Sequence, residues 1–247
     1  MITFFEDAAI KINHARLNHF LSLDLNIKNM RILETGCGAA GFFTSYLENN
    51  SKEVLSIDAR QDVIEAHKRA FPHRSHKLKL ANLNTPDILK DLGEFDLAFC
   101  YGTLYHLSNP EVGIKNIAEA GKMSIIETIC HPIDNGLINR CIEDANNPNQ
   151  SFDGGACRPA RDWILMELNR YYKYTYITKT QPKHIEFPRS WPVLSEKANS
   201  GGGYNTRAVF LGSHTPMNDK YFSQILINSQ TTNSIIHDLY KQLKAIF

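Results

Sequence analysis

A glycine-rich turn between a short apolar run and a helical segment limits what this chain can fold into. Residues 31–35 (Arg-Ile-Leu-Glu-Thr) are typical of a buried strand, Gly36, Gly38 and Gly41 follow within six residues, and residues 42–47 are typical of a helix. Glycine suits such a turn because the sharp bend demands a positive φ, and because a Cβ would hold a ligand away from the backbone. Strand, glycine turn and helix together predict a nucleotide-binding site, but the glycines alone do not choose between dinucleotides and other nucleosides.

Composition narrows the class of protein. The chain has 247 residues, of which 43% are hydrophobic and 21% charged, as expected of one large α/β domain covering residues 1–247. Lys and Arg (27) nearly balance Asp and Glu (26), so no global basic field points to nucleic acid. Five cysteines without a CxxC pair indicate free thiols in a reducing compartment. An acidic amino-terminal segment and the lack of an apolar run of about 18 residues predict a cytoplasmic protein without a membrane span.

Apolar runs alternate with helical segments along the chain. The alternation predicts a parallel sheet with both faces covered by helices. The predicted strands are residues 31–35, 53–58, 76–80, 95–101, 122–128, 172–178 and 206–212. The predicted helices are residues 8–21, 42–47, 61–70, a short one near Pro86, 110–120, a weak one over 137–144, one from Arg158 to about Tyr171, and a polar tail from about Asp219.

Two segments outside this alternation are expected to complete a site. The amphipathic helix within residues 1–28 either forms a lid over the glycine turn or packs on the sheet edge. Residues 131–205 are expected to contain the insertions of a cap that binds substrate, because a segment this long between elements of a compact domain is usually functional or disordered. Within it, Gly201, Gly202 and Gly203 are predicted to be flexible.

Polar residues stand where two further strands end. Asp58 closes the second strand, 22 positions after Gly36, where its carboxylate is placed to accept both ribose hydroxyl hydrogen bonds of an adenosine. The alternative for Asp58 is a cap on the helix that follows. Asn82 follows the third strand and either contacts the adenine edge or is a turn asparagine.

The combination of these motifs resembles a known enzyme family. Glu34-x-Gly36-x-Gly38, the acid Asp58, and residues 95–97 (Phe-Asp-Leu) leading into Tyr101-Gly102-Thr103-Leu104-Tyr105-His106-Leu107 are similar to a class I S-adenosylmethionine-dependent methyltransferase. The resemblance covers about residues 29–130. It implies an α/β, Rossmann-like sheet of seven strands in the order 3-2-1-4-5-7-6, with the seventh strand antiparallel, helices on both faces and an inserted cap. Glu34 argues against a flavin or nicotinamide enzyme, because a carboxylate before the glycines would repel a pyrophosphate.

The resemblance also implies the ligand and the residues that hold it. The cofactor would be S-adenosyl-L-methionine, with S-adenosyl-L-homocysteine as the product. Glu34, Gly36 and Gly38 would cradle its methionine and ribose portions, Asp58 would hold the ribose hydroxyls, and Asn82 and Leu83 would flank adenine. The full set of cofactor-binding residues that we expect is Glu34, Gly36, Cys37, Gly38, Asp58, Ala59, Asn82, Leu83 and Tyr101.

Methyl transfer from a sulfonium needs a general base only if the accepting atom carries a proton. Three side chains are candidate catalytic residues, each with an alternative. His106 follows the fourth strand and is otherwise a structural histidine; Glu127 ends the fifth strand and is otherwise a helix cap or ion-pair partner. His184 lies in a strand-like loop and is otherwise a surface residue.

Substrate-binding residues are expected in the cap and beside the fourth strand. Tyr105 would line the methyl-transfer channel together with Tyr101, for which a core role is the alternative, because aromatic faces attract a sulfonium cation. Arg158 and Arg161, with Arg189, would hold a carboxylate or phosphate of the substrate. The alternative is solvation at a helix start or ion pairs with Asp153 and Asp162. Glu186 and Trp191 are expected in a pocket wall. No metal is expected, because Cys130, His131, Cys141 and Cys157 lack the short spacings of a zinc site.

These inferences predict methyl transfer to a small polar molecule or glycan, with O-methylation by a histidine base as the expected chemistry. Residues 154–159 and 180–191 are similar to a bacterial group often found beside sugar-modifying genes, which favours a glycan-like acceptor. One alternative is an RNA methyltransferase of the transfer-RNA type, against which the near-neutral charge argues. Another is a non-catalytic partner subunit that keeps the cofactor site. The sequence does not predict the oligomeric state.

Overall fold

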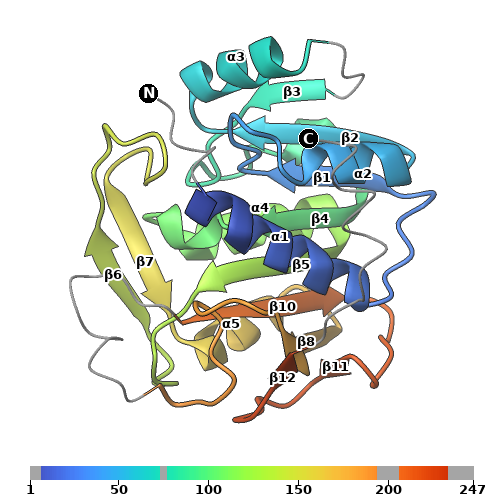
Figure 1. Ribbon diagram of the computed structural model, residues 1–247, viewed down its shortest axis with the longest axis vertical. Coiled ribbons are helices and arrows are strands. Elements are labelled where there is room, and N and C mark those ends of the chain that lie inside the picture. Colours follow the sequence, from blue (N-terminus) through green and yellow to red (C-terminus); the bar gives the residue numbers. More distant parts are fainter. Residues whose placement is uncertain (1–6, 73–76, 194–205, 233–247) are drawn as a thin grey trace.

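The protein is described by a computed structural model that covers residues 7–72, 77–193 and 206–232. Its main sheet has eight strands in the order β11-β8-β10-β5-β4-β1-β2-β3 (Figure 1). The strands are β1 (Arg31–Thr35), β2 (Glu53–Asp58), β3 (Lys77–Leu80), β4 (Phe95–Tyr101), β5 (Gly121–Ile129), β8 (Tyr174–Thr178), β10 (Arg207–Ser213) and β11 (Phe222–Ser223). The helices are α1 (Asp7–Ser22), α2 (Thr44–Asn50), α3 (Gln61–Ala70), α4 (Pro110–Ala120) and α5 (Arg161–Leu168), with short 3-10 turns η2 (Lys90–Leu92) and η3 (Leu104–His106).

Strand pairing confirms the predicted sheet. Strands β3, β2, β1, β4 and β5 pair in parallel, and β10 runs antiparallel to both β5 and β8. Counting β8 and β10 as the sixth and seventh strands gives the predicted order 3-2-1-4-5-7-6. The short strand β11 extends the edge beyond β8.

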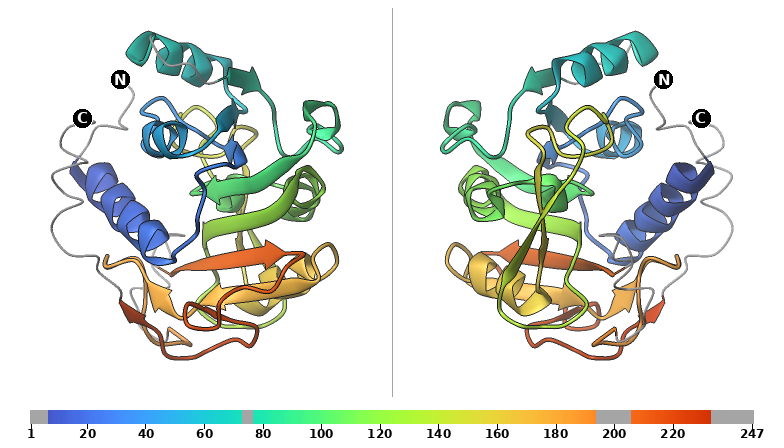
Figure 2. Two further views of the ribbon diagram at one scale, coloured as in Figure 1. Left: turned by 90° about the vertical axis from the view of Figure 1, so that its right-hand side faces the viewer. Right: turned by 90° about the vertical axis from the view of Figure 1, so that its left-hand side faces the viewer.

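Helices cover both faces of this sheet, and each face has its own apolar core. Helices α1 and α2 lie on one face, where Phe20 and Leu47 pack against Ile32 and Phe99 of the central strands (Figure 2). Helices α4 and α5 lie on the other face. Burial on both sides explains why the central strands are continuous apolar runs rather than alternating ones. None of the helices in the described ranges is long and apolar enough to cross a membrane.

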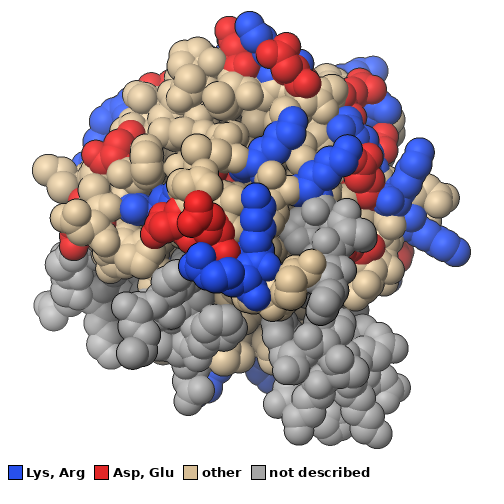
Figure 3. Space-filling view, turned by 90° about the horizontal axis from the view of Figure 1, so that it is seen from above, with Lys and Arg blue, Asp and Glu red and all other residues tan. Residues whose placement is uncertain are grey.

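The edge strand β3 carries charge where the sheet would otherwise be open. Lys77 and Lys79 of β3 are exposed, as are Lys68 and Arg69 in the last turn of α3. Seen from above, Lys and Arg side chains gather in the middle of this face, with Asp and Glu side chains around them (Figure 3). Charged side chains on an edge strand oppose pairing with a second sheet edge.

The segment after β5 differs from the prediction. Residues 137–144 are not helical: β6 (Ile138–Ile142) pairs antiparallel with β7 (Gly155–Pro159) to form a hairpin. Arg158 and Pro159 therefore belong to a strand, and helix α5 begins only at Arg161. The hairpin stands at the carboxyl ends of the parallel strands (Figure 1). Its pairing joins Ile138 to Pro159, 21 residues away, a contact that helical periodicity cannot reveal.

Smaller differences concern helix ends and the carboxyl-terminal part. The helix predicted near Pro86 is wrong: this stretch forms turns, with Asp87 at a φ of +56°, before η2. The second helix begins at Thr44 rather than at residue 42. Residues 219–232 contain β11 and β12 (Thr231–Thr232), which pairs with β9 (Thr180–Gln181), instead of a helical tail. His76, the Gly201–203 run and the remainder of the predicted tail lie outside the described residues.

Candidate active site

Two adjoining cavities open where the parallel strands end. Cavity A, with about 720 Å³ of empty space, lies between the glycine turn, the end of β2 and the loop of the β6–β7 hairpin. Cavity B, with about 970 Å³, lies between the glycine turn, helix α1 and the end of β4. The residues that line both cavities are Gly36, Gly38, Gly102, His106 and Asn149.

The glycine turn has the backbone that the sequence predicts. Gly36 and Gly38 have φ values of +65° and +62°. A Cβ on Gly36 would lie 2.1 Å from Oγ1 of Thr103, which itself donates a hydrogen bond to the carbonyl of Thr35. The turn therefore holds β1 and the end of β4 close together and leaves its backbone facing both cavities.

Glu34 lies behind this turn rather than in a cavity. Its side chain is buried, and Oε2 accepts hydrogen bonds from Thr44 Oγ1 (2.7 Å) and Ser56 Oγ (2.6 Å). These bonds join β1 to α2 and β2. The structure thus gives Glu34 a role in fixing the turn, and Glu34 is absent from the residues that line either cavity.

Asp58 lines cavity A at the end of β2. Its Oδ2 accepts a hydrogen bond from the backbone N–H of Gly38 (3.2 Å), and its Oδ1 accepts one from the backbone N–H of Arg60 (3.0 Å). Burial raises the pKa of Asp58 against the opposing effect of these hydrogen bonds. Helix α3 has no side-chain cap, so the structure does not support the capping alternative for Asp58.

Three further residues of the predicted cofactor set line cavity A. Ala59 follows Asp58, while Asn82 and Leu83 lie after β3. The side-chain oxygen of Asn82 accepts a hydrogen bond from the backbone N–H of Asn84 (3.0 Å), so this asparagine also forms the turn that was the alternative reading. The turn role is therefore present, and the contact of Asn82 with adenine stays a prediction.

The remaining two residues of that set line cavity B. Cys37 is buried, and burial raises the pKa of its thiol well above the usual value. Tyr101 is 5% exposed and stacks on Phe99 with ring centroids 4.3 Å apart, as the core alternative predicted. Its hydroxyl has no hydrogen-bond partner within the described ranges, although it borders the cavity. A buried hydroxyl without a partner at a cavity wall indicates a place for a polar ligand atom.

Helix α1 forms one wall of cavity B, through Ala9, Ile12, Asn13 and Arg16. Its opposite side packs Phe20 into the sheet core. The structure therefore combines the lid position with the sheet packing that the sequence left as alternatives. Whether α1 moves as a lid stays a prediction.

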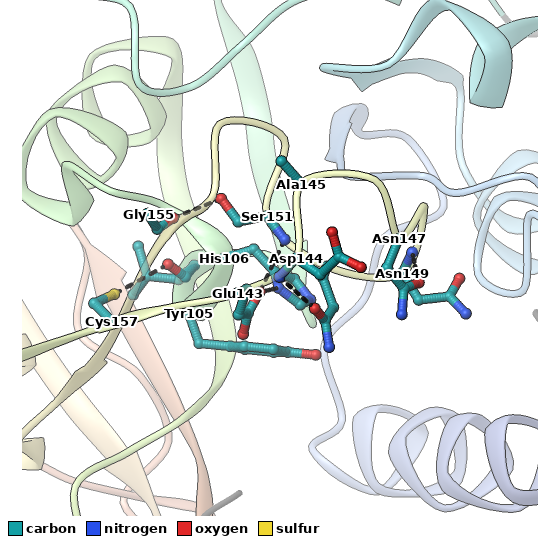
Figure 4. Close-up of polar contacts among 12 residues, drawn as sticks. Tyr105, His106, Glu143, Asp144, Ala145, Asn147, Asn149, Ser151, Gly155 and Cys157 are labelled. Carbon is teal, nitrogen blue, oxygen red and sulfur yellow. Dashed lines mark hydrogen bonds and ion pairs between the residues drawn. The ribbon is translucent and has the colours of Figure 1, made fainter. Parts of the chain in front are cut away.

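His106 stands at the junction of the two cavities. Its Nδ1 lies 2.5 Å from Oε2 of Glu143, in the loop after β6 (Figure 4). Burial lowers the pKa of His106, although Glu143 opposes the shift. Burial would raise the pKa of Glu143, but the hydrogen bonds from His106, Arg158 and the Ser151 backbone hold it at about 2. The neutral histidine thus donates from Nδ1 to a carboxylate and keeps an unprotonated Nε2.

Four charged side chains form a chain of ion pairs along cavity B. Glu127 is fully buried between Arg16 (Nη2–Oε2, 2.8 Å) and Arg207 (Nη1–Oε1, 3.2 Å). Arg207 also pairs with Glu186 (Nε–Oε2, 2.6 Å) and lies over the ring of Tyr105, 4.9 Å from its centroid. The geometry favours the ion-pair alternative for Glu127 over a general base, since both of its oxygens face guanidinium groups and neither cavity reaches it.

The substrate-binding predictions divide into two groups. Tyr105 and Glu186 line cavity B. Arg158 instead pairs with Glu143 (2.9 Å) and donates to the carbonyl of Tyr105, and it lies behind the cavity wall. Arg161 is fully buried, pairs with Asp134 and covers the ring of Trp191 at 4.0 Å. The structure therefore places Arg158, Arg161 and Trp191 in supporting positions, where ion pairs were the alternative for the two arginines.

His184, the third candidate base, lies apart from this site. It borders a different hollow formed with Lys183, Phe187 and Arg189, and its Nδ1 accepts a hydrogen bond from the backbone N–H of Glu186 (3.3 Å). Arg189 is exposed in the same hollow. The surface alternative for His184 fits this position.

Sequence reasoning missed several residues of the site. The charged ones are Arg16, Arg60, Glu143 and Arg207, and Asn13 and Asn149 are amides of the cavity walls. A pattern in the sequence could have indicated two of them. Arg207 is a charged residue at the start of an apolar strand, and Arg16 is a charged residue on the buried side of a helix. Glu143 had no such pattern, because the hairpin that carries it was predicted as a helix.

Comparisons with known proteins agree with this architecture. Residues 33–122 match the family model for a methyltransferase domain. The ubiquinone biosynthesis O-methyltransferase of Coxiella burnetii is 25% identical over 107 residues, which are 43% of this chain and 45% of that protein. The chain spans less than half the length of the first curated relatives it matches, 22% of an uncharacterized Synechococcus protein and 45% of the Coxiella enzyme.

Solved structures show the same fold at low sequence identity. The N-terminal domain of EvdMO1, determined in the presence of SAH and D-fucose, has a TM-score of 0.60 and 17% identity, and the alignment covers 84% of each chain. Magnesium protoporphyrin IX methyltransferase from Synechocystis PCC 6803, with bound SAM, has a TM-score of 0.53 and 13% identity over 83% of this chain and 82% of that one. The family-model match over residues 33–122, the order of the sheet and the glycine turn between the two cavities show that the chain has the fold of the class I S-adenosylmethionine-dependent methyltransferases.

Proposed function

We propose that this protein transfers a methyl group from S-adenosyl-L-methionine to a hydroxyl of a small, neutral, polar molecule such as a sugar, with His106 as the general base. The observation that carries the proposal is the position of His106, which borders both cavities at once. A residue at that junction is placed to touch the accepting atom where the two ligands meet. The cofactor supplies a methyl group on a sulfonium, which is already activated for displacement.

The residues of cavity A fit the nucleoside part of this cofactor. Asp58 presents a carboxylate at the end of β2, where an adenosine ribose would offer its two hydroxyls. Asn82 and Leu83 offer an amide and an apolar face to a base. Relatives of the same fold were determined with SAM or SAH bound, which supports the same choice here.

Cavity B has unsatisfied polar atoms that fit the amino-acid end of the cofactor. Nε of Arg16 is buried without a hydrogen-bond partner among the described residues, as is the hydroxyl of Tyr101. The guanidinium of Arg16 also lies close to Gly102, where a Cβ would be 3.4 Å from its nitrogens. Two donors beside bare backbone suit a carboxylate, so we assign the methionine carboxylate to Arg16 and Tyr101.

The charges around cavity B favour a neutral acceptor. Arg16 and Arg207 are balanced by Glu127 and Glu186, and the Arg158 charge is balanced by Glu143. An ionised acceptor would therefore meet no uncompensated opposite charge. Asn13, Tyr105 and Asn149 add amide and phenol groups to this wall, as expected for a site that binds hydroxyls. The presence of D-fucose with a relative of the same fold supports a sugar-like acceptor.

A hydroxyl acceptor needs a base because its pKa lies far above neutrality. His106 meets the requirements, since its Nδ1 is occupied by Glu143 and burial keeps the ring neutral. The unprotonated Nε2 is then the atom that accepts the hydroxyl proton as the new bond forms. Glu127 and His184 remain less suitable, the first because it is ion-paired and the second because it lies in another hollow.

Calorimetry with S-adenosyl-L-methionine tests the cofactor half. Asp58→Ala is expected to weaken binding by roughly 10- to 100-fold, because a hydrogen bond to a charged group contributes about 1.5–3 kcal/mol. Asp62→Ala, an exposed acid in the first turn of α3, is the matched control and is expected to bind like the wild type. Absence of binding by the wild type, or equal binding by both variants, would exclude the assignment.

Transfer of a labelled methyl group to a panel of monosaccharides tests the acceptor half. His106→Ala is expected to lower the rate by about 10²- to 10⁴-fold while leaving cofactor affinity unchanged. Cofactor binding without transfer to any neutral hydroxyl compound would favour the non-catalytic partner subunit instead.

A further inference from the structure

The loop of the β6–β7 hairpin places the carboxylate of Glu143 beside Nδ1 of His106. We propose that Glu143 is a positioning residue that holds His106 as the neutral Nδ1–H tautomer and thereby points its basic Nε2 at the acceptor. This inference rests on the proposed role of His106 as the base. It adds a residue from outside the matched methyltransferase domain, which ends at residue 122.

The contacts of Glu143 leave one arrangement for the shared proton. Oε1 accepts from Nη2 of Arg158 (2.9 Å), and Oε2 accepts from the backbone N–H of Ser151 (2.8 Å) as well as facing Nδ1 of His106 (2.5 Å) (Figure 4). Arg158 and Ser151 donate only, so they keep Glu143 in its ionised, accepting form. The proton between Glu143 and His106 therefore stays on Nδ1.

The groups around His106 set its charge as well as its tautomer. Arg158 and Arg207 are the cations that face the ring, Glu143 is the facing anion, and the ring of Tyr105 packs against it with centroids 4.0 Å apart. The two guanidinium groups and burial oppose protonation of His106, whereas Glu143 favours it. The carboxylate thus restrains the fall in basicity that burial would cause and keeps Nε2 able to take a proton.

The loop that carries Glu143 is docked on the cofactor side of the site. Nη2 of Arg60 donates to the backbone carbonyls of Ala145 (2.7 Å), Ser151 (3.0 Å) and Asn147 (3.3 Å). The backbone N–H of Arg60 is at the same time bonded to Asp58. Arg60, two residues after the proposed ribose-binding Asp58, therefore also fixes the loop of Glu143, so the segment that borders cavity A also holds the residue that orients the base.

Replacement of Glu143 by glutamine creates a defined conflict. The amide of glutamine has one oxygen and one NH₂ group in place of the two carboxylate oxygens. Arg158 donates to one of these two atom positions and the Ser151 backbone donates to the other, so one donor faces the NH₂ group. The charged Arg158 takes the oxygen more strongly, and the NH₂ group is then turned toward His106. His106 must accept at Nδ1, and its proton moves to Nε2, where it blocks the function of a base.

Nitrogen-15 NMR of the histidine ring tests this inference without any acceptor. In the wild type we expect His106 as the Nδ1–H tautomer near neutral pH, identified by its loss from the spectrum of His106→Gln. In Glu143→Gln we expect the Nε2–H tautomer, and in Glu143→Asp at least partial return to Nδ1–H. Glu111→Gln is the matched control, because this half-buried glutamate of α4 pairs with Arg140 on the same hairpin but does not contact His106. A wild-type Nε2–H tautomer, or an unchanged tautomer in Glu143→Gln, would overturn the proposal.

Binding and transfer measurements separate this inference from the proposed function. Glu143→Gln is expected to bind S-adenosyl-L-methionine like the wild type and to transfer to the monosaccharide panel about 10²-fold more slowly or worse. The acid limb of its pH–rate profile is expected to move to lower pH, because the charge that favours protonation of His106 is gone. If Glu143→Gln lowers thermal stability but leaves the acid limb of the pH–rate profile unmoved, Glu143 has only a structural role and the proposal is wrong. If the wild type binds no cofactor, the proposed function fails whatever tautomer His106 adopts.

Discussion

Protonation of His19 is expected to destabilise the protein in mildly acidic solution. This histidine of α1 is fully buried; its Nε2 donates to the carbonyl of Thr180 (2.9 Å), and its Nδ1 has no hydrogen-bond partner among the described residues. Burial lowers the pKa of His19 from its usual 6.5 to about 4. The unfolded chain therefore binds a proton that the folded chain excludes, so stability is complete above about pH 6.5 and is lost as the pH falls toward 4.

The size of the effect follows from linkage. A difference of 2.5 between the two pKa values corresponds to about 3.4 kcal/mol when fully expressed. Between about pH 7.5 and pH 5.5 the expected loss is roughly 1.3 kcal/mol, and it reaches roughly 2.5 kcal/mol at about pH 4.5. Other groups titrate in the same window, so the quantity to measure is the difference between the wild type and a variant that cannot titrate at this position.

Urea unfolding of the wild type and His19→Gln at these three pH values provides the assay. The glutamine amide can keep a hydrogen bond to Thr180, and the free energy of unfolding of the variant is expected to fall less with acid by the amounts above. His214→Gln, at an exposed position, is the control and should parallel the wild type. Equal pH dependence of the wild type and His19→Gln would refute the reasoning, because it would mean that the buried imidazole either protonates freely or is solvated in the native state.

Two further substitutions test the site at other points. Gly36→Ala is expected to abolish cofactor binding, because its Cβ would lie 2.1 Å from Oγ1 of Thr103. Gly136 has a similar φ of +68°, but a Cβ there would be 3.9 Å from its nearest atom, so Gly136→Ala should cost only about 1–2 kcal/mol of stability. Calorimetry and thermal unfolding of both variants distinguish the steric clash from the cost of a positive φ. Glu127→Gln is expected to lower the free energy of unfolding by about 3 kcal/mol or more, because it leaves two buried guanidinium groups undercompensated, while the exposed Glu94→Gln should change it by under about 1 kcal/mol. Full stability of Glu127→Gln with loss of transfer alone would instead favour a catalytic Glu127.

The sheet and the cofactor half of the site follow from local signals. Strand β2 and helix α3 have the predicted bounds because a continuous apolar run and an amphipathic period are each contained within a few residues. The end of a parallel strand also fixes which edge its last residue faces, so the sequence predicts the common edge at which Gly36, Asp58 and Asn82 line cavity A. Glu34 shows the limit of this logic, because the direction of a side chain at a strand end depends on neighbours such as Ser56 on the next strand.

The other half of the site depends on pairing over long sequence separations. Glu143 meets His106 across 37 positions, and Arg207 meets Glu127 across 80. Neither pair has a spacing that a helix or hairpin would impose, and the polar segment 137–144 fits a helical period about as well as a strand. Arg161 illustrates the converse error, because an arginine at the start of a helix suggests a substrate contact until its burial and its partner Asp134 are known.

The two halves of the site differ in whether the family-model match includes them. The family-model match covers residues 33–122 and so includes the glycine turn, Asp58 and His106, but it ends before the hairpin and β10. On the present inference, the match contains the base without the carboxylate that orients it, and without Arg207 and Glu186, which line the acceptor cavity. A relative aligned over the same residues therefore shares the cofactor edge of the sheet, whereas the segments that we propose to orient the base and to bind the acceptor lie outside the alignment. On this proposal, the accepting atom is selected where the hairpin brings Glu143 to His106.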